Sequence, residues 1–357
     1  MAGGQKHMIV IRPVEKGAAP GERLAQVIDY ALAGRIYEII EKADRLRPIK
    51  DRRILFAVDV GDTGVNLEYQ KMLRWMRSHP GAFEGCVAGV LVDGANDLYT
   101  KSTAKELVFT ANCAGAAFVG RPLVEGTGGL GNFRIVASNM GVDVRKAYDL
   151  SARILADQVM DFTSAVKENP NLLVLHASSH RTSNTYELWK LVREGLQGID
   201  ITEIGLRNGT LSDCSGCPYS TCLHFGEQGS CFYGGVMVDD VYPAVRKADA
   251  VLLLCPNYND ALSANLTAFI NRLTALFRTY RFYEKAVFAL VVSGYSGSDI
   301  IAEQVISALN MNKTFFLPGQ FAMMETANNA GEILTLPGIR ERALTFSARV
   351  RDFLERY

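Results

Sequence analysis

The sequence predicts a two-domain α/β protein in which doubly wound parallel sheets are covered by helices on both faces. Short, continuous apolar runs alternate with helical patterns along the whole chain, and such runs are typical of strands buried on both faces of a parallel sheet. The chain has 357 residues, 48% of them hydrophobic. That length exceeds the usual size of one domain and can supply more than one core.

The predicted strands are short apolar runs. In chain order they are residues 8–11, 54–60, 87–92, 116–119, 172–176, 199–204, 250–254, 286–293 and 314–317. The predicted helices lie between the strands, where apolar residues recur every three or four positions. In chain order they are residues 24–42, 66–78, 102–114, 144–162, 185–194, 263–280, 299–309 and 338–356.

A polar segment at residues 167–171, Lys-Glu-Asn-Pro-Asn, separates the two halves of the chain. Its proline disfavours helix at the preceding residue, so one helix ends before the next strand begins. We therefore expect an N-terminal α/β domain over residues 1–168 and a second domain over residues 169–357. Both halves contain a strand, a polar turn and a helix, at residues 54–77 and 172–193. A degenerate duplication is one interpretation, although no residue-level identity decides it.

The charge balance argues against nucleic acid as a partner. Lysines plus arginines number 38, and aspartates plus glutamates also number 38, so no basic footprint for nucleic acid or an anionic membrane is visible. No apolar run approaches the roughly 20 residues that span a bilayer, and residues 1–6 do not resemble a signal peptide. We expect a soluble cytoplasmic protein, a compartment in which clustered cysteines favour metal binding or catalysis over disulfides.

A turn rich in hydroxyl groups follows the predicted strand at 172–176 and leads directly into an amphipathic helix. A helix N-terminus offers backbone donors and a dipole that favours negative charge, so this turn is a candidate phosphate site. Ordinary helix capping is the alternative, because Ser, Thr and Asn are also the preferred N-cap residues. The candidate residues are Ser178, Ser179, Arg181, Ser183, Asn184 and Thr185.

Two further polar turns follow the strands at 250–254 and 286–293. They are Cys255-Pro-Asn-Tyr-Asn-Asp260 and Ser293-Gly-Tyr-Ser-Gly-Ser298. The carboxyl ends of parallel strands lie at one edge of the sheet, where open α/β sheets bind their ligands. The three turns are therefore expected to line one crevice.

The second half resembles the NAD(P)H-dependent FMN reductase and iron-sulfur flavoprotein branch of the flavodoxin-like superfamily. Its phosphate turn is roughly G-S-x-R-x-x-S-N-T, and the matching residues, in order, are Arg181, Ser183, Asn184 and Thr185. Pro256, Tyr258, Ser263 and Arg272 fit the P-x-Y turn and the helix after it, and Ser293-Gly294 fits the third flavin loop. The resemblance covers roughly residues 172–357. The sequence departs from the pattern at Ala177, Thr267 and Asn271.

The resemblance implies a flavodoxin-like fold, bound FMN, NAD(P)H as an electron donor and a homo-oligomer. It places the FMN phosphate in the first turn and the isoalloxazine ring between the other two turns. The residues implied for the ring, in addition to those of the phosphate turn, are Pro256, Asn257, Tyr258, Asn259, Ser293, Gly294, Tyr295 and Gly297.

Four cysteines lie within residues 213–231, which we expect to form an insertion. Their spacing is C-x2-C-x4-C-x8-C, and they are Cys214, Cys217, Cys222 and Cys231. Three interpretations stay open: a [4Fe-4S] cluster, zinc held by four thiolates or with His224 replacing one, and thiols near the flavin without metal. These cysteines are spaced further apart than those of the cluster pattern in the iron-sulfur flavoproteins that this segment resembles.

Three other features have simpler explanations. The sequence Gly-Thr-Gly-Gly-Leu-Gly at 126–131 matches a dinucleotide fingerprint, but the residues after it suggest extended chain rather than the required helix, so we expect a loop. Asp59, Asp62, Asp93 and Asp97 end two predicted strands, where capping and turn roles explain carboxylates better than a cation site. We expect His176 to be a packed or hydrogen-bonded side chain.

These patterns predict an FMN-dependent oxidoreductase that passes electrons from NAD(P)H or a reduced carrier through FMN to a small-molecule or protein acceptor. A flavin supplies the difficult chemistry itself, so no catalytic acid or base is assigned. A non-enzymatic electron-transfer flavoprotein that serves protein partners is one alternative. A zinc-stabilised interaction module without flavin is another.

Overall fold

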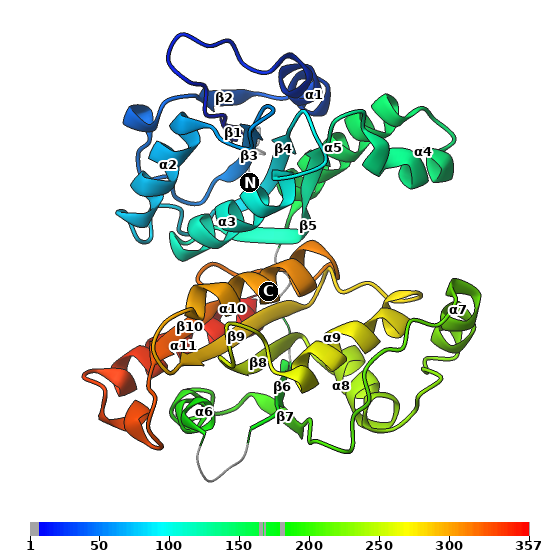
Figure 1. The fold of residues 1–357 in the computed structure, drawn as a ribbon. Coiled ribbons are helices and arrows are strands. Elements are labelled where there is room, and N and C mark those ends of the chain that lie inside the picture. Colours follow the sequence, from blue (N-terminus) through cyan, green and yellow to red (C-terminus); the bar gives the residue numbers. More distant parts are fainter. Residues whose placement is uncertain (1–6, 164–166, 168, 179–182, 357) are drawn as a thin grey trace. The chain divides into compact units, whose positions relative to one another are not determined.

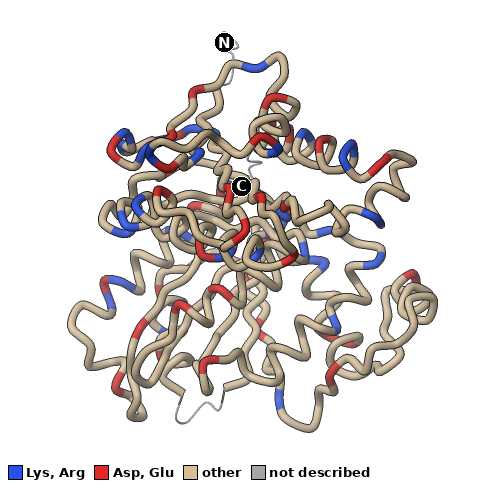
Figure 2. The backbone as a smooth tube through the Cα atoms, turned by 45° about the horizontal axis from the view of Figure 1, so that its top comes forward, with Lys and Arg blue, Asp and Glu red and all other residues tan. Residues whose placement is uncertain are grey.

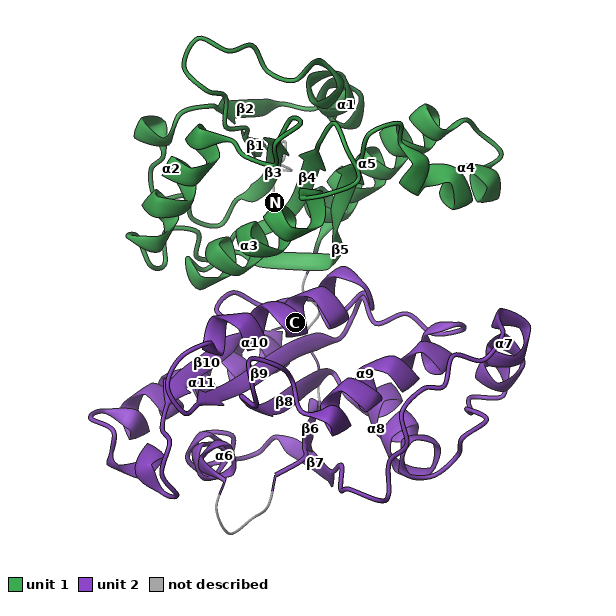
Figure 3. Ribbon diagram, viewed as in Figure 1, with its two compact units in different colours: residues 1–162 green, residues 163–357 purple. Residues whose placement is uncertain are grey.

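The computed structural model describes residues 7–163, 167, 169–178 and 183–356. The chain divides into two compact units, Met1–Phe162 and Thr163–Tyr357, coloured separately in Figure 3. Basic and acidic residues are intermixed along the described backbone (Figure 2). Among the described residues, no helix is both long enough and apolar enough to cross a membrane.

Unit 1 is a parallel five-stranded sheet in the order β2-β1-β3-β4-β5, labelled in Figure 1. The strands are β1 (Met8–Ile11), β2 (Tyr37–Ile40), β3 (Arg53–Asp59), β4 (Val87–Asp93) and β5 (Ala117–Gly126). The helices are α1 (Glu22–Leu32), α2 (Leu67–Arg77), α3 (Thr100–Cys113), α4 (Arg134–Met140) and α5 (Val144–Asp161), with short turns η1 (Ala43–Arg45) and η2 (Gly131–Phe133).

Unit 2 is a second parallel five-stranded sheet, in the order β10-β9-β8-β6-β7. The strands are β6 (Asn171–His176), β7 (Asp200–Gly205), β8 (Ala250–Pro256), β9 (Ala286–Ser293) and β10 (Ala322–Thr326). The helices are α6 (Asn184–Glu194), α7 (Tyr219–Glu227), α8 (Tyr242–Lys247), α9 (Ala264–Phe277), α10 (Ser298–Val305) and α11 (Ile339–Arg356), with η3 (Met237–Val241), η4 (Ile306–Met311) and η5 (Glu332–Thr335).

The two sheets share one topology. Counted within each unit, both have the strand order 2-1-3-4-5, which is the flavodoxin-like order with its ligand crevice between the first and third strands. The predicted doubly wound, flavodoxin-like fold is confirmed, and the N-terminal unit repeats it. The switch points lie between β1 and β3 in unit 1 and between β6 and β8 in unit 2.

The central strands form the cores of the units. All seven residues of β4 and all eight of β9 are buried, as expected for strands covered by helices on both faces. In unit 1, apolar side chains of α1 and α5 pack in one cluster with β1, β3 and β4. This packing holds the strand ends rigid, so the loops that follow them have defined positions.

The predicted helix at 24–42 is too long. Helix α1 ends at Leu32, Gly34 adopts a left-handed φ of 79°, and residues 37–40 form the edge strand β2 beside β1. Glycine reaches this backbone region without the steric cost that other residues incur, so the chain can turn there. The helical spacing of the apolar residues continued past the turn and concealed the strand.

Two further elements differ from the prediction. The last strand is β10 rather than residues 314–317, where Phe316 makes only an isolated bridge to Ala286. The residues after the Gly-rich segment at 126–131 form η2 and α4, not extended chain. Phe133 and Ala137 pack into the unit 1 core, and this tertiary contact outweighs the β-propensity of Ile135 and Val136.

The units differ most between their second and third strands. In unit 1 the chain passes from β2 to β3 through η1 alone. In unit 2 the passage from β7 to β8 contains α7, η3, α8 and all four clustered cysteines. The cysteine segment is therefore an elaboration of unit 2 at this one connection.

Candidate functional site

The three predicted turns follow β6, β8 and β9, which are adjacent in the unit 2 sheet. Because the strands are parallel, the turns lie at the same edge of the sheet. A fourth loop, residues 327–331, follows β10 and completes this edge. The described parts of these four loops form the candidate site.

The first turn contains a buried hydroxyl without a partner among the residues that the structure describes. This hydroxyl is the Oγ atom of Ser178, and Thr185 is buried in the first turn of α6. Ser183 caps α6, with its Oγ accepting a hydrogen bond from the Tyr186 backbone N at 3.2 Å. Ser179 and Arg181 lie outside the described residues. A buried hydroxyl of this kind, in the turn that leads to a helix N-terminus, suits an anionic ligand such as phosphate.

Asn184 uses its side-chain amide to hold the fourth loop. Its Nδ2 donates to the carbonyl oxygens of Ala327 at 3.1 Å and Asn329 at 2.8 Å, and its Oδ1 accepts from the Ile333 backbone N at 3.4 Å. The amide is therefore satisfied by protein groups. Asn184 positions the first turn against the fourth loop, a role that the sequence pattern did not predict.

Asn257 joins the second and third loops. Its Nδ2 donates to Ser293 Oγ at 3.1 Å and to the Ser296 carbonyl at 3.0 Å, and its Oδ1 accepts from the Asp260 backbone N at 2.9 Å. Ser293 is completely buried, and its Oγ lies 2.8 Å from Ser298 Oγ. These bonds fix the spacing between the loops that were predicted to border a flat ring.

Two exposed aromatic rings rise from the second and third loops. Tyr258 is 59% exposed and Tyr295 is 81% exposed, and rings of this kind can contact a planar ligand through their faces. Asn259 and Gly297 adopt left-handed φ angles of 54° and 86°. A Cβ atom at Gly297 would lie 2.3 Å from Asp260 Oδ1, so only glycine fits there. Pro256 and Gly294 complete the two loops.

The fourth loop was missed by the sequence prediction. Asn328 Nδ2 donates to the Tyr295 hydroxyl at 3.1 Å, which links this loop to the third. The Glu332 carboxylate accepts from the backbone N atoms of Asn328 and Asn329, and these bonds lower the pKa of Glu332. The run Ala-Asn-Asn-Ala-Gly at 327–331 was the available signal, but the preceding strand had been placed too early.

Polar side chains of β6 and β7 contact helix α6. His176, at the end of β6, is 4% exposed, and its Nε2 lies 3.5 Å from Glu203 Oε1. Although burial opposes it, hydrogen bonds from Trp189 Nε1 and the Tyr186 hydroxyl lower the pKa of Glu203. Glu203 therefore links the end of β6 to α6. Cys255, at the end of β8, is fully buried, and burial raises the pKa of its thiol.

The four clustered cysteines line one cavity of about 210 Å³ next to α9. Cys214 is exposed, the other three are partly buried, and all four are free thiols. Within the described parts of the chain, no group of three or more His, Cys, Asp or Glu residues is arranged to hold a metal ion. The thiols share a cavity without converging on one point.

The equivalent crevice of unit 1 is occupied by a carboxylate. A cavity of about 170 Å³ lies between the loop after β1 and the loop after β3. Asp59 Oδ2 lies only 1.8 Å from the position of a Cβ atom built at Gly21, the residue before α1. Asp59 Oδ1 accepts from the Gly61 backbone N at 2.9 Å, and burial raises the pKa of Asp59. A carboxylate at the start of α1 disfavours phosphate there.

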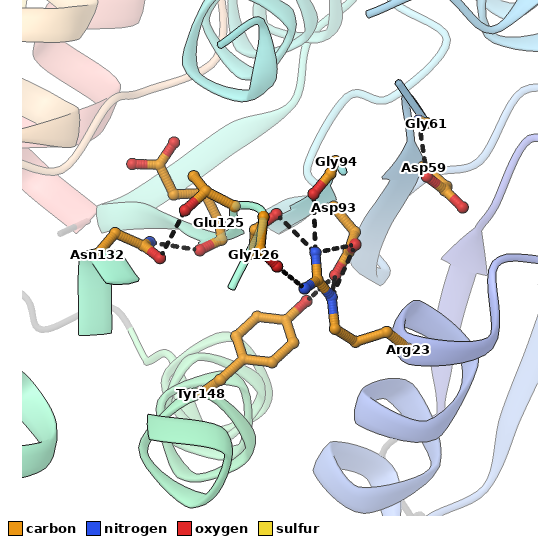
Figure 4. A network of polar contacts seen from close by, with 11 residues as sticks. Arg23, Asp59, Gly61, Asp93, Gly94, Glu125, Gly126, Asn132 and Tyr148 are labelled. Atoms are coloured by element: carbon orange, nitrogen blue, oxygen red, sulfur yellow. Dashed lines mark hydrogen bonds and ion pairs between the residues drawn. The ribbon is translucent and has the colours of Figure 1, made fainter. Parts of the chain in front are cut away.

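An ion pair between partly buried Arg23 and buried Asp93 lies at the same edge of unit 1 (Figure 4). Arg23 donates from Nε and Nη2 to the Asp93 carboxylate at 2.7–3.0 Å, and Asp93 also accepts from the Tyr148 hydroxyl at 2.9 Å. Arg23 also donates to the carbonyls of Gly126 and Gly128, at 3.2 and 2.6 Å. The Gly-rich loop thus presents carbonyl oxygens to an arginine, and Asp93 has a structural role.

Comparison with known proteins agrees with the resemblance found in the sequence. Residues 170–329 match the family model described as NADPH-dependent FMN reductase, and no curated protein matches the chain. An NAD(P)H:quinone oxidoreductase from Methanothermobacter marburgensis is 19% identical, with a TM-score of 0.39, over 53% of this chain and 98% of its own. An azoreductase from Bacillus anthracis str. Sterne is 17% identical, with a TM-score of 0.36, over 51% and 98%.

Proposed function

We propose that unit 2 binds FMN and that the protein is an FMN-dependent oxidoreductase using NAD(P)H as electron donor. The family match over residues 170–329 supports this proposal. The observation that carries it is the Ser178 hydroxyl, which is buried and has no hydrogen-bond partner within the described part of the chain. It lies in the turn before α6, at the switch point of a flavodoxin-like sheet. A flavin mononucleotide supplies the phosphate for such a turn and a planar ring for the neighbouring loops.

In this proposal the chain's own residues bind and orient the cofactor. Ser178, Ser183, Thr185 and the N-terminus of α6 hold the phosphate, and Asn184 keeps this turn in register with the fourth loop. Ser179 and Arg181 complete the phosphate site. The ring is bordered by the second and third loops, through Pro256, Asn257, Tyr258, Asn259, Ser293, Gly294, Tyr295 and Gly297.

When bound, FMN supplies hydride and single-electron transfer. The described loops contribute little acid-base chemistry, because Ser293 and Asn257 are satisfied by each other and by neighbouring loop atoms. The work of the protein is to position the ring and to keep its reactive face accessible. The electron acceptor is a small molecule or a protein, and the homo-oligomeric state stays a prediction that light scattering tests.

A spectrum and a reduction assay test the proposal. Protein purified without oxygen is expected to show oxidised flavin bands, or to take up added FMN in a 1:1 ratio, and NADPH or NADH should bleach the bands. Absence of uptake would contradict the proposal. Bands that a reduced ferredoxin bleaches and a nicotinamide does not would instead support a non-enzymatic electron carrier.

Metal analysis of the same sample decides the role of the cysteines. Stoichiometric iron and sulfide with a broad absorbance shoulder would support a [4Fe-4S] cluster on Cys214, Cys217, Cys222 and Cys231. Stoichiometric zinc without flavin would support an interaction module. Flavin reduction by nicotinamide requires neither metal, so the proposal for FMN is tested separately.

A further inference from the structure

The cavity of about 210 Å³ beside α9 combines positive charge with aromatic walls and has no carboxylate in its lining. Besides the four thiols, the lining includes the rings of Phe225, Phe232 and Tyr233 and the side chains of Arg272 and Arg278. These residues belong to none of the four loops of the proposed flavin site. The cavity therefore requires an explanation of its own.

Arg272 is the more deeply buried of the two arginines in this lining. Its side chain is fixed within the protein, because the residue is only 2% exposed. Its Nη2 donates to the Gly234 carbonyl at 2.7 Å, its Nη1 lies 3.5 Å from the Ser212 carbonyl, and its Nε is buried without a partner. These partners are neutral. Among the described residues, the guanidinium thus has no hydrogen-bonded counter-charge, and a buried charge without one is unfavourable.

Arg278 adds a second cation, but its charge is already stabilised by other groups. Its guanidinium stacks over the Tyr219 ring, 4.5 Å from the ring centroid, and it caps the C-terminus of α9. The helix dipole already stabilises a cation at that end. Arg272 lies within α9, on the wall of the cavity, so a counter-charge for Arg272 has to come from the cavity itself.

The remaining walls favour a flat apolar group. Phe225 and Phe232 meet edge to face with ring centroids 5.6 Å apart, and Phe232 meets Tyr233 in the same way at 5.2 Å. A further aromatic ring can pack against the faces and edges of rings in this arrangement. An engineered cavity of about 150 Å³ binds benzene, so the volume here suffices for one ring with a small substituent.

We propose that this cavity binds a small aromatic anion, such as a benzene ring carrying a carboxylate, with Arg272 as its buried counter-charge. The ring lies against the aromatic walls, and the carboxylate accepts hydrogen bonds from the guanidinium, an arrangement stronger than a neutral hydrogen bond. This site does not depend on flavin binding. Four thiolates holding a metal would also place negative charge near Arg272. The experiment distinguishes this source of counter-charge from a bound aromatic anion.

The test compares two probes that differ only in charge. Benzoate and its neutral isostere benzamide are titrated into the reduced, full-length protein by calorimetry, after its iron, zinc and flavin contents have been measured. We expect benzoate to bind roughly tenfold or more tightly than benzamide, since one charge-assisted contact separates them. Equal affinity, or no binding of either probe, would overturn the proposal. So would stoichiometric metal, because thiolates would then supply the counter-charge.

Variants identify the residue responsible. Arg272→Gln should reduce benzoate affinity roughly tenfold and leave benzamide unchanged, whereas Arg281→Gln is the matched control, because Arg281 is exposed and absent from the lining. Phe232→Ala should weaken both probes, and Phe232 is 62% exposed, so this change does not threaten folding. FMN content is expected to stay unchanged in all three variants. Unchanged benzoate binding in Phe232→Ala, or in a folded Arg272→Gln, would refute the site.

Discussion

The two units perform the same task at their sheet edges with different chemistry. In unit 2, Asn184 in the first turn of α6 donates to the carbonyls of residues 327 and 329. In unit 1, Arg23 in the first turn of α1 donates to the carbonyls of residues 126 and 128. Each side chain ties the first helix of its unit to the loop after the fifth strand. We call the neutral amide of Asn184 the neutral clamp and the cation of Arg23 the charged clamp.

The difference lies in how each unit satisfies the charges at its sheet edge. The cation of Arg23 requires Asp93 as counter-charge, and Asp59 occupies the start of α1, so unit 1 fills its edge with its own charges. The neutral clamp of unit 2 needs no counter-ion, and the hydroxyl of Ser178 has no partner among the described residues. Fold alone therefore does not decide which unit binds a ligand.

The largest expected loss of stability comes from breaking the charged clamp. Arg23→Met removes the cationic partner of the buried Asp93 carboxylate, which keeps its hydrogen bond from the Tyr148 hydroxyl, and is expected to destabilise unit 1 by about 3–5 kcal/mol. Urea unfolding followed by a probe in unit 1 measures this loss. Arg77→Met is the control, because its exposed pair with Glu106 contributes under about 1 kcal/mol. Arg23→Met combined with Asp93→Asn should recover part of the loss, and no recovery would contradict the clamp.

The neutral clamp should cost less to break and should affect ligand binding as well. Asn184→Ala leaves the carbonyls of Ala327 and Asn329 without their donor, and we expect unit 2 to lose about 1–3 kcal/mol. FMN retention should fall because the first turn loses its register with the fourth loop. Asn312→Ala is the control, since that side chain is exposed. Unchanged stability would show that the amide is dispensable.

Removing the unpartnered hydroxyl should separate binding from stability. Ser178→Ala breaks no hydrogen bond to the described residues, so the free energy of unfolding should change by less than about 0.5 kcal/mol. FMN affinity should fall roughly tenfold, equivalent to one lost contact to the phosphate. Fluorescence titration measures the affinity, with Ser102→Ala in unit 1 as control. An unchanged FMN affinity would remove Ser178 from the phosphate site.

The smallest expected effect is the pH dependence of stability, which has opposite signs in the two units. Burial raises the pKa of Asp59, so its ionised form opposes folding, and unit 1 should gain stability as acid protonates it. Hydrogen bonds lower the pKa of Glu203 despite its burial. Glu203 therefore stabilises unit 2 above its ordinary pKa, and this contribution is lost as pH falls through the lowered value.

Urea midpoints measured from pH 7 to pH 3 test both signs. Asp59→Asn should stabilise unit 1 at neutral pH by under about 1 kcal/mol, and Glu203→Gln should destabilise unit 2 at neutral pH. Both variants should approach the parent protein as the pH falls. Effects of the same sign would show that one of the two environments is misassigned.

The fold was largely predictable because strand cores carry a local signal. The strands at 8–11 and 286–293 begin and end where the sequence predicted them. The flavodoxin-like resemblance implied the strand order of unit 2, whereas for unit 1 a degenerate copy was only one interpretation. The edge elements β2 and β10 were harder to identify. Each is short and lies next to a tight turn, and the apolar spacing of β2 suits a helix as well as a strand.

The sequence pattern predicted which residues belong to the candidate site, whereas the hydrogen-bond partners of these residues became visible only in the structure. Asn184 matches the phosphate pattern in sequence, yet its hydrogen-bond partners lie 143 and 145 residues away, and no local pattern reports such a partner. The same holds for Arg272, which was noted only as a match in the helix after the P-x-Y turn. Its burial against the cysteine segment depends on a passage whose helices the sequence did not predict.

The two clamps also differ in when they can form during synthesis. The Arg23 contact to Gly128 spans 105 residues, whereas the Asn184 contact to Asn329 spans 145. Contacts of high sequence separation form late, because loop closure must precede them. Unit 1 can close its edge while unit 2 is still being translated, since domains fold as units from the N-terminus. The first turn of α6 should then be among the last parts of the chain to become ordered, after residue 329 has left the ribosome.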